Sequence, residues 1–256
     1  MTGNSPKIVI PQERDVRLLS ELAVLRIVDR EQAKIVAGFG STTRANARLL
    51  ALTKARFLHR FFWGTVGGAR RALYSLSSRG AALAGVPYRR PRRGQGQVLA
   101  MDSWSAHQLE VNDVYLILKF QPFPTDSRFI RWVSLEQPLH GALIPDGYAE
   151  IKVREKTLAL FVEVDRGTEG REVWHAKAQA YLAFATSGNF VKQFGQPQFR
   201  TLVIANSESR LTFLRNTTAT LTDKVFRFTT WERIRRETFW GNVWHKAVGD
   251  QRLALL

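Results

Sequence analysis

The chain is 256 residues long, and 45% of its residues are hydrophobic and 11% aromatic. This composition allows one large domain or two ordinary ones with real cores, and it excludes a disordered chain. No apolar run of about 18 residues and no basic start followed by a short apolar segment occurs, so neither a membrane span nor a secretory signal is predicted. The absence of cysteine excludes disulfides, zinc-thiolate sites and thiol nucleophiles, and it fits a cytoplasmic protein.

The net charge of +16 is concentrated in the first hundred residues. Residues 1–100 hold 18 Lys and Arg against 5 Asp and Glu, whereas residues 101–256 hold 20 against 17. A concentrated positive field favours a polyanion, and 28 of the 38 basic residues are Arg, whose forked side chain suits phosphate. We therefore expect a nucleic-acid partner, with a solvated basic surface or an anionic membrane as the alternatives.

Three helices are predicted at the start of the chain. Residues 13–28 carry apolar side chains at mainly helical spacing. A second helix begins at Asp29, a candidate N-cap, and ends at the break formed by Gly38 and Gly40; a third begins at Ser41. The third helix has one apolar stripe and turns short polar and basic side chains away from it, as a helix that enters a DNA groove would.

Two strands, residues 57–63 and 69–76, are predicted to follow around the turn GTVGG, and residues 77–85 to form a short closing helix. Three helices, a basic hairpin and a helix resemble a winged helix-turn-helix, which implies DNA contact through the third helix and the hairpin. A small helical domain used for protein contacts is the alternative. The candidate DNA contacts lie on the third helix and the hairpin: Thr43, Arg44, Arg48, Lys54, Arg60, Arg70 and Arg71.

The run YRRPRRGQGQ, residues 88–97, cannot bury a core and predicts a linker. The sequence thus divides into a winged-helix domain, a basic linker and a second domain, at residues 1–88, 89–100 and 101–256. The second domain is predicted to be α/β (α+β), with a mixed sheet and helices on both faces. Its expected helices are residues 105–118, 171–185 and 210–221, and its expected strands are residues 129–135, 141–153, 157–165, 199–206 and 225–230.

Two acidic residues stand out within the strand at residues 157–165. Glu163 and Asp165 are two positions apart, so they share one face of the strand, opposite an apolar face. Like charges this close repel, and burying either one is costly unless a cation offsets it. The pattern therefore indicates a cation close to this strand.

Pro145-Asp146 on one strand and Glu163 on the next, 17 residues later, resemble the hairpin of the PD-(D/E)xK nuclease superfamily. The resemblance implies that Asp146 and Glu163 bind Mg²⁺ or Mn²⁺, and that Glu110, or else Asp113, is an accessory acid on the preceding helix. Where that motif has Lys, this chain has Asp165. The resemblance implies that Lys177 of the following helix replaces it and that Asp165 or Glu110 completes the shell; a Lys177 that reaches past the sheet to solvent is the alternative.

The succession of a winged helix, LIPDGY, FVEVDRGTE and WHAKAQAYL resembles the replication-relaxation family of plasmids and integrative elements, over about residues 14–230. This resemblance implies a cytoplasmic, plasmid-associated protein that binds double-stranded DNA and acts beside other replication, relaxation or transposition proteins. It leaves a homodimer open. A Mg²⁺-dependent DNA endonuclease or nickase is the first functional hypothesis, and a nuclease-like platform that no longer cuts is the alternative.

Overall fold

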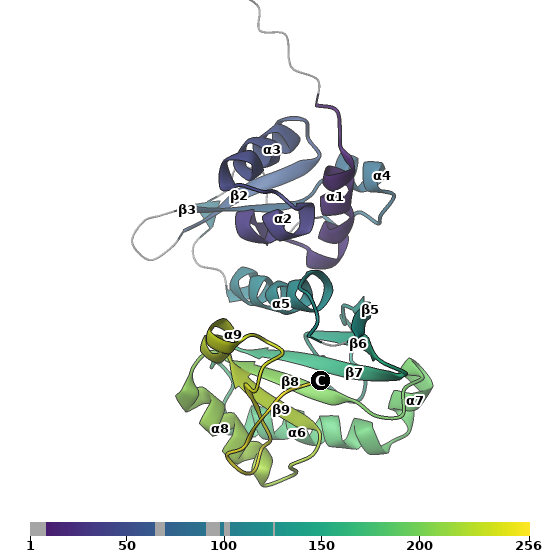
Figure 1. The fold of residues 1–256 in the computed structure, drawn as a ribbon, viewed down its shortest axis with the longest axis vertical. Coiled ribbons are helices and arrows are strands. Elements are labelled where there is room, and N and C mark those ends of the chain that lie inside the picture. Colours follow the sequence, from purple (N-terminus) through teal and green to yellow (C-terminus); the bar gives the residue numbers. More distant parts are fainter. Residues whose placement is uncertain (1–8, 65–69, 91–97, 100–102, 125) are drawn as a thin grey trace, which may run out of the picture. The chain divides into compact units, whose positions relative to one another are not determined.

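The computed structural model describes residues 9–64, 70–90, 98–99, 103–124 and 126–256 (Figure 1). It divides into two compact units, residues 1–116 and 117–256. This division differs from the predicted boundary at residues 89–100, because it falls inside helix α5 (Ser103–Phe120). Side chains tie the first part of α5 to the first unit: the Asn112 amide donates to the Ile27 carbonyl at 2.6 Å, and the Gln32 amide donates to the Leu109 carbonyl at 2.8 Å.

The first unit has the predicted order of three helices, a hairpin and a closing helix. Its sheet has the strand order β1-β3-β2-β4, in which β2 and β3 form the antiparallel hairpin. The turn predicted at GTVGG is residues 64–68, of which all but Gly64 lie outside the described residues, as does most of the predicted linker, at residues 91–97. The elements are α1 (Glu13–Leu25), β1 (Val28–Asp29), α2 (Arg30–Ala37), α3 (Thr42–Lys54), β2 (Leu58–Gly64), β3 (Arg70–Leu76), α4 (Ser78–Ala84) and β4 (Val98–Leu99).

The predicted starts of the second and third helices are confirmed at their caps, whereas the first helix, predicted over residues 13–28, ends at Leu25. The Asp29 carboxylate accepts from the Gln32 backbone N–H at 2.8 Å, and the Ser41 hydroxyl accepts from the Arg44 N–H at 3.3 Å. Each cap satisfies a backbone donor that the first helical turn leaves without a partner. Gly38 ends α2 in the left-handed conformation, at φ 66°, which a side chain with a Cβ rarely adopts.

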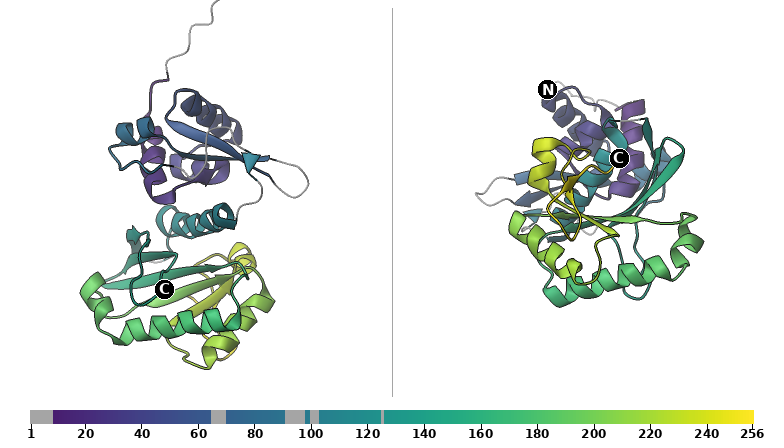
Figure 2. Two further views of the ribbon diagram at one scale, coloured as in Figure 1. Left: turned by 180° about the vertical axis from the view of Figure 1, so that it is seen from behind. Right: turned by 60° about the horizontal axis from the view of Figure 1, so that its bottom comes forward.

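The second unit is a mixed sheet of strand order β11-β10-β9-β8-β7-β6-β5, in which β7, β8 and β9 run parallel and the other neighbours antiparallel. Helices α6 and α8 cover one face and α9 lies on the other, as predicted (Figures 1 and 2). The elements after α5 are β5 (Ser127–Val133), β6 (Gly147–Val153), β7 (Lys156–Asp165), α6 (Arg171–Thr186), α7 (Asn189–Phe194), β8 (Arg200–Ala205), α8 (Glu208–Ala219), β9 (Phe226–Thr230), α9 (Trp231–Glu237), β10 (Trp244–His245) and β11 (Arg252–Leu253).

An aromatic core lies between the sheet and helices α6 and α8. Trp174 and Tyr181 of α6 and Phe161 of β7 are fully buried in it. Trp174 also donates its indole N–H to the Thr218 hydroxyl at 2.9 Å, so its buried donor is satisfied. This packing fixes α6 across β7, and it determines which α6 side chains face the strand. None of the described helices has the length and apolar character needed to cross a bilayer.

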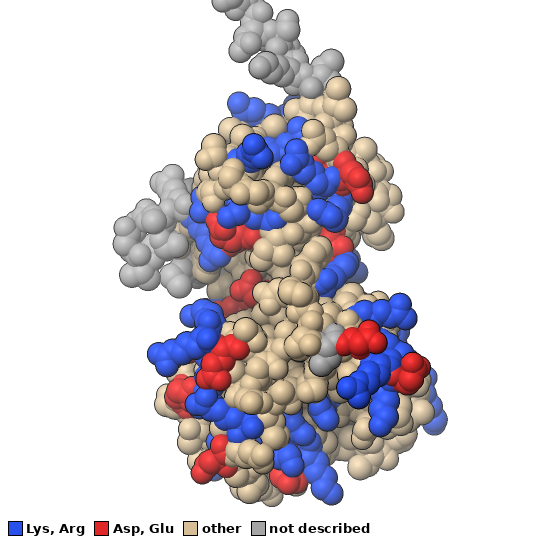
Figure 3. Space-filling model, viewed as in Figure 1, with Lys and Arg blue, Asp and Glu red and all other residues tan. Residues whose placement is uncertain are grey.

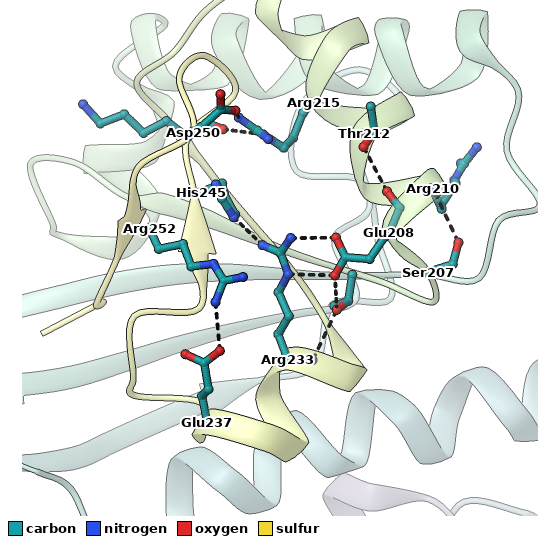
Figure 4. A network of polar contacts seen from close by, with 12 residues as sticks. Ser207, Glu208, Arg210, Thr212, Arg215, Arg233, Glu237, His245, Asp250 and Arg252 are labelled. Atoms are coloured by element: carbon teal, nitrogen blue, oxygen red, sulfur yellow. Dashed lines mark hydrogen bonds and ion pairs between the residues drawn. The ribbon is translucent and has the colours of Figure 1, made fainter.

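A polar network joins the end of the chain to the sheet (Figure 4). The Arg233 guanidinium donates to both oxygens of Glu208, at 2.7 and 2.6 Å, and contacts Nε2 of the buried His245. Arg252 of β11 pairs with Glu237 at the end of α9 at 2.8 Å. These contacts hold the two-residue strands β10 and β11 against β9. Elements this short carry no periodicity, so the sequence did not predict them.

Candidate active site

Asp146 is held by the backbone of the neighbouring strand. Its N–H donates to the Val162 carbonyl at 3.1 Å, and its carboxylate accepts from the Val164 N–H at 2.7 Å. The next residue, Gly147, leaves room for the Trp132 ring, which a Cβ at this position would meet at 2.1 Å. The Asp146 carboxylate therefore has a fixed place beside the carboxyl end of β7.

Glu163 of β7 is 3% exposed and is bound by two side chains of α6. The Tyr181 hydroxyl donates to its Oε1 at 2.6 Å, and Lys177 Nζ lies 3.1 Å from its Oε2. Positions 174, 177, 178 and 181 recur at helical spacing, so Lys177 faces the sheet together with the buried Trp174. Lys177 also lies 2.9 Å from Glu169 Oε1, in the loop between β7 and α6. The structure thus brings Glu163 and Lys177 together, as the resemblance implied.

The electrostatics of this site leave it short of positive charge. Burial first, and the nearby Asp146 carboxylate second, raise the pKa of Glu163, although Lys177 and the Tyr181 hydroxyl lower it. Burial lowers the pKa of Lys177, but the charges of Glu163 and Glu169 outweigh it and raise that pKa overall, so the lysine is protonated at neutral pH. The single positive charge of Lys177 does not neutralise the three carboxyl groups near it, those of Asp146, Glu163 and Glu169. A divalent cation would supply the missing positive charge.

Asp165, two residues along the same face of β7, has different partners. Arg210 of α8 donates to it through Nε at 2.6 Å and Nη2 at 2.7 Å, and the Gly167 N–H donates at 2.8 Å. The Asp165 and Arg210 side chains are only 4% and 12% exposed. Both oxygens of Asp165 are therefore engaged by the fold. The structure places this carboxylate in an ion pair with α8, where the sequence had left open a role in the metal shell.

The accessory acids expected on α5 belong to the first unit. The Asp113 carboxylate accepts from the Gln32 amide at 2.7 Å, and Glu110 lies one turn earlier on the same helix. In the described part of the chain, no group of three or more His, Asp or Glu side chains is arranged to hold a metal. Within the second unit, the candidate donor set is the carboxylate pair Asp146 and Glu163. Mg²⁺ is commonly held by one or two carboxylates and keeps several waters, so this pair fits it.

Two site residues were not predicted from the sequence. Tyr181 belongs to the buried stripe of α6, and its position four residues after Lys177 places both on one face. Burial, followed by the charge of Glu163, raises the pKa of the Tyr181 phenol, so the hydroxyl remains a hydrogen-bond donor. Glu169 lies in an irregular loop, where no periodicity indicates the direction of a side chain. The sequence feature that could have indicated Glu169 is its acidic side chain in the segment just before the helix that carries Lys177.

The predicted DNA contacts of α3 divide into exposed and engaged side chains. Thr43, Arg44 and Lys54 are exposed. Arg48 instead donates through Nε to the fully buried Asp15 carboxylate at 3.0 Å and through Nη2 to the Ile10 carbonyl at 2.7 Å. Its guanidinium therefore fastens α3 to α1, and its assignment as a groove contact lacks support. Figure 3 shows further Lys and Arg side chains over the first unit.

The predicted DNA contacts of the hairpin, Arg60 and Arg71, have different partners within the fold. The Arg60 guanidinium lies over the Phe62 ring, 4.6 Å from its centroid. Arg71 pairs with Asp29, the cap of α2, and its side chain is still 47% exposed. The side chain of Arg70 lies outside the described residues. The ion pair with Asp29 thus positions the Arg71 side chain, about half of which remains accessible to solvent.

No curated protein matches this chain. The restriction endonuclease FokI is similar over 85% of this chain and 42% of its own, with 12% sequence identity and a TM-score of 0.27, and the chain thus spans less than half the length of that enzyme. A family model described as "Replication-relaxation" matches residues 14–196, which is most of the chain. The protein is therefore a member of the replication-relaxation family.

Proposed function

We propose that the protein is a divalent-cation-dependent DNA endonuclease or nickase of a mobile element, brought to double-stranded DNA by its basic first unit. The observation that carries the proposal is the buried Glu163, which lies near Asp146 and 3.1 Å from the protonated Lys177. Two acids and an inward cation at the end of a strand are groups that metal-assisted phosphodiester hydrolysis can use.

Asp146 and Glu163 are the residues that would hold Mg²⁺ or Mn²⁺. Both supply oxygen ligands of the kind these hard cations prefer. A bound cation would also relieve the repulsion between the two carboxylates. When bound there, the ion would neutralise charge on a phosphate group and lower the pKa of a coordinated water.

The chain's own side chains have separate tasks in this proposal. Lys177 supplies a fixed positive charge for the phosphate oxygens, on which negative charge builds up as the bond breaks. Tyr181 orients Glu163 by donating to Oε1, and Glu169 holds the lysine from the other side. Lys177 on α6 thereby takes the place of the lysine that Asp165 replaces on β7, since Asp165 serves the ion pair with Arg210.

The distribution of charge supports a DNA substrate. The first hundred residues hold 13 more basic than acidic side chains, and Arg44 and Lys54 stand exposed on α3. Such a surface binds phosphates largely without regard to sequence and carries the second unit to its substrate.

The test is an incubation of supercoiled plasmid, carrying an origin-like site from the same element, with the full chain and Mg²⁺. We expect nicked or linear product from the wild type, and none from Asp146→Asn or Glu163→Gln. Glu172→Gln, an exposed acid at the start of α6, is the matched control and should cut normally. Intact plasmid, under conditions in which binding is demonstrated, would contradict the proposal and favour the accessory protein that no longer cuts.

A further inference from the structure

A second charged site lies at the other end of the parallel strands. A pocket of about 320 Å³ opens near the starts of β7, β8 and β9, whereas Glu163 lies near the end of β7. Three cations line it, Arg200, Lys224 and Arg227, and no acidic side chain is among the described residues that do. We call it the basic pocket. It has no part in the proposed cleavage reaction.

The two arginines of the basic pocket leave positive charge uncompensated. The register of β8 and β9 pairs Leu202 with Arg227, so Arg200 and Arg227 lie on one face of adjacent strands. Arg200 donates to the Leu255 carbonyl at 3.1 Å, and Arg227 to the carbonyls of Lys224 and Phe226. Carbonyl oxygens satisfy the N–H groups without neutralising their charge.

The same conclusion follows from the surroundings of Arg227. Burial first, and the charge of Arg200 second, lower the pKa of its guanidinium. Asp223 opposes this shift but does not line the pocket. A half-buried pair of like charges beside an open pocket attracts an anion, and Arg clusters commonly recognise acidic groups.

The floor of the basic pocket is apolar, which distinguishes peptide from DNA. Leu158 of β7, on the same sheet face as Arg200 and Arg227, and Val225, just before β9, line it and are partly exposed. A sugar-phosphate backbone offers no large apolar group for this floor. An acidic peptide with one large apolar side chain offers both parts: carboxylates for the cations and a hydrophobic group that gains by burial.

We propose that the basic pocket binds an acidic peptide segment of a partner protein, which anchors one large apolar side chain on Leu158 and Val225. Its carboxylates pair with Arg200, Lys224 and Arg227. The pocket is thus a docking site through which another protein is recruited to this one, and it works whether or not the site at Asp146 and Glu163 cuts DNA.

The test is the fluorescence anisotropy of a labelled peptide, a run of aspartates that ends in Leu-Phe with a free carboxylate, titrated with the full chain. We expect saturable binding that Lys224→Glu weakens about tenfold, because a charge-assisted contact becomes a repulsion. Arg235→Glu changes the net charge equally at an exposed position of α9 and should leave the affinity unchanged. A peptide that ends in Ser-Ser should bind about tenfold more weakly than the Leu-Phe peptide.

Three results would overturn this inference: no saturable binding, equal losses in Lys224→Glu and Arg235→Glu, or displacement of the peptide by duplex DNA at the basic pocket. The last would assign the pocket to DNA. Peptide binding is measured without metal, and the cleavage-site variant Asp146→Asn should bind the peptide as the wild type does. Failure of the docking site and failure of the proposed nuclease are therefore separate outcomes.

Discussion

Glu163 and Asp165 are the same kind of residue on the same face of one strand, yet their surroundings assign them different roles. Arg210 engages both oxygens of Asp165 through a planar fork, and its charge is used up in that pair. Lys177 gives Glu163 a single point charge and shares it with Glu169, while Asp146 adds repulsion. The partners thus separate an acid that is paired one-to-one with an arginine from an acid that shares a single lysine with Glu169 and lies near Asp146.

The largest expected effect is on cleavage. Glu163→Gln and Asp146→Asn should each lower the rate of plasmid nicking by about a thousandfold or more, because either change removes a carboxylate ligand and with it the charge that favours the ion. Nicking of supercoiled plasmid on gels measures this, with DNA affinity and the melting temperature followed in parallel. A Glu163→Gln variant that cuts at the wild-type rate would show that Glu163, like Asp165, is not needed for cleavage.

The next effect is on stability. Asp165→Asn leaves Arg210 buried without a countercharge and should lower the free energy of unfolding by roughly 3 kcal/mol, whereas the double variant Asp165→Leu/Arg210→Met should recover most of that loss. Urea unfolding measures both. The folded fraction of Asp165→Asn should still cut DNA. Loss of cleavage at unchanged stability would instead place Asp165 in the active site.

A third prediction extends the comparison to the polar network at the end of the chain. Burial first, and the charge of Arg233 second, lower the pKa of His245 to about 4. The unfolded chain therefore binds a proton between about pH 6.5 and pH 4 that the folded protein does not, and stability falls as the pH falls through this range. From pH 7.5 to 4.5 the wild type should lose about 2 kcal/mol more than His245→Gln, as urea unfolding at both pH values would show. Equal losses would mean that His245 is protonated in the folded protein.

The smallest expected effect is on DNA affinity. Arg44→Ala should weaken binding by about 1 kcal/mol and reduce the salt slope by about one, because an exposed arginine makes one phosphate or base contact. Arg48→Ala should leave the salt slope unchanged. It should lower the free energy of unfolding, because it leaves the buried Asp15 carboxylate without its countercharge. Filter binding at several salt concentrations separates the two. If both variants change the slope equally, Arg48 leaves Asp15 when DNA binds.

The elements that sequence patterns predicted are those determined by neighbours in the chain. The caps at Asp29 and Ser41 and the inward direction of Lys177 follow from spacing within single helices. The partners of Arg48 and Asp165 do not, because Arg48 meets a residue 33 positions away and Asp165 one 45 positions away. Such distant contacts decide whether an acid or an arginine is exposed or paired within the fold. Spacing along the chain does not reveal them, so the sequence pattern predicted functional roles for Arg48 and Asp165.

The residues of the candidate site also lie close together along the chain. Asp146, Glu163, Glu169, Lys177 and Tyr181 all come from one continuous stretch, β6, β7 and α6, with the β6–β7 hairpin at its start. Contacts between near neighbours close short loops at low entropic cost and form early in folding. The parallel pairing of β8 with β7 comes after a longer connection. The acidic site is therefore expected to take shape before the rest of the sheet, and the stretch 146–181 is the smallest continuous piece of the protein that contains all five residues.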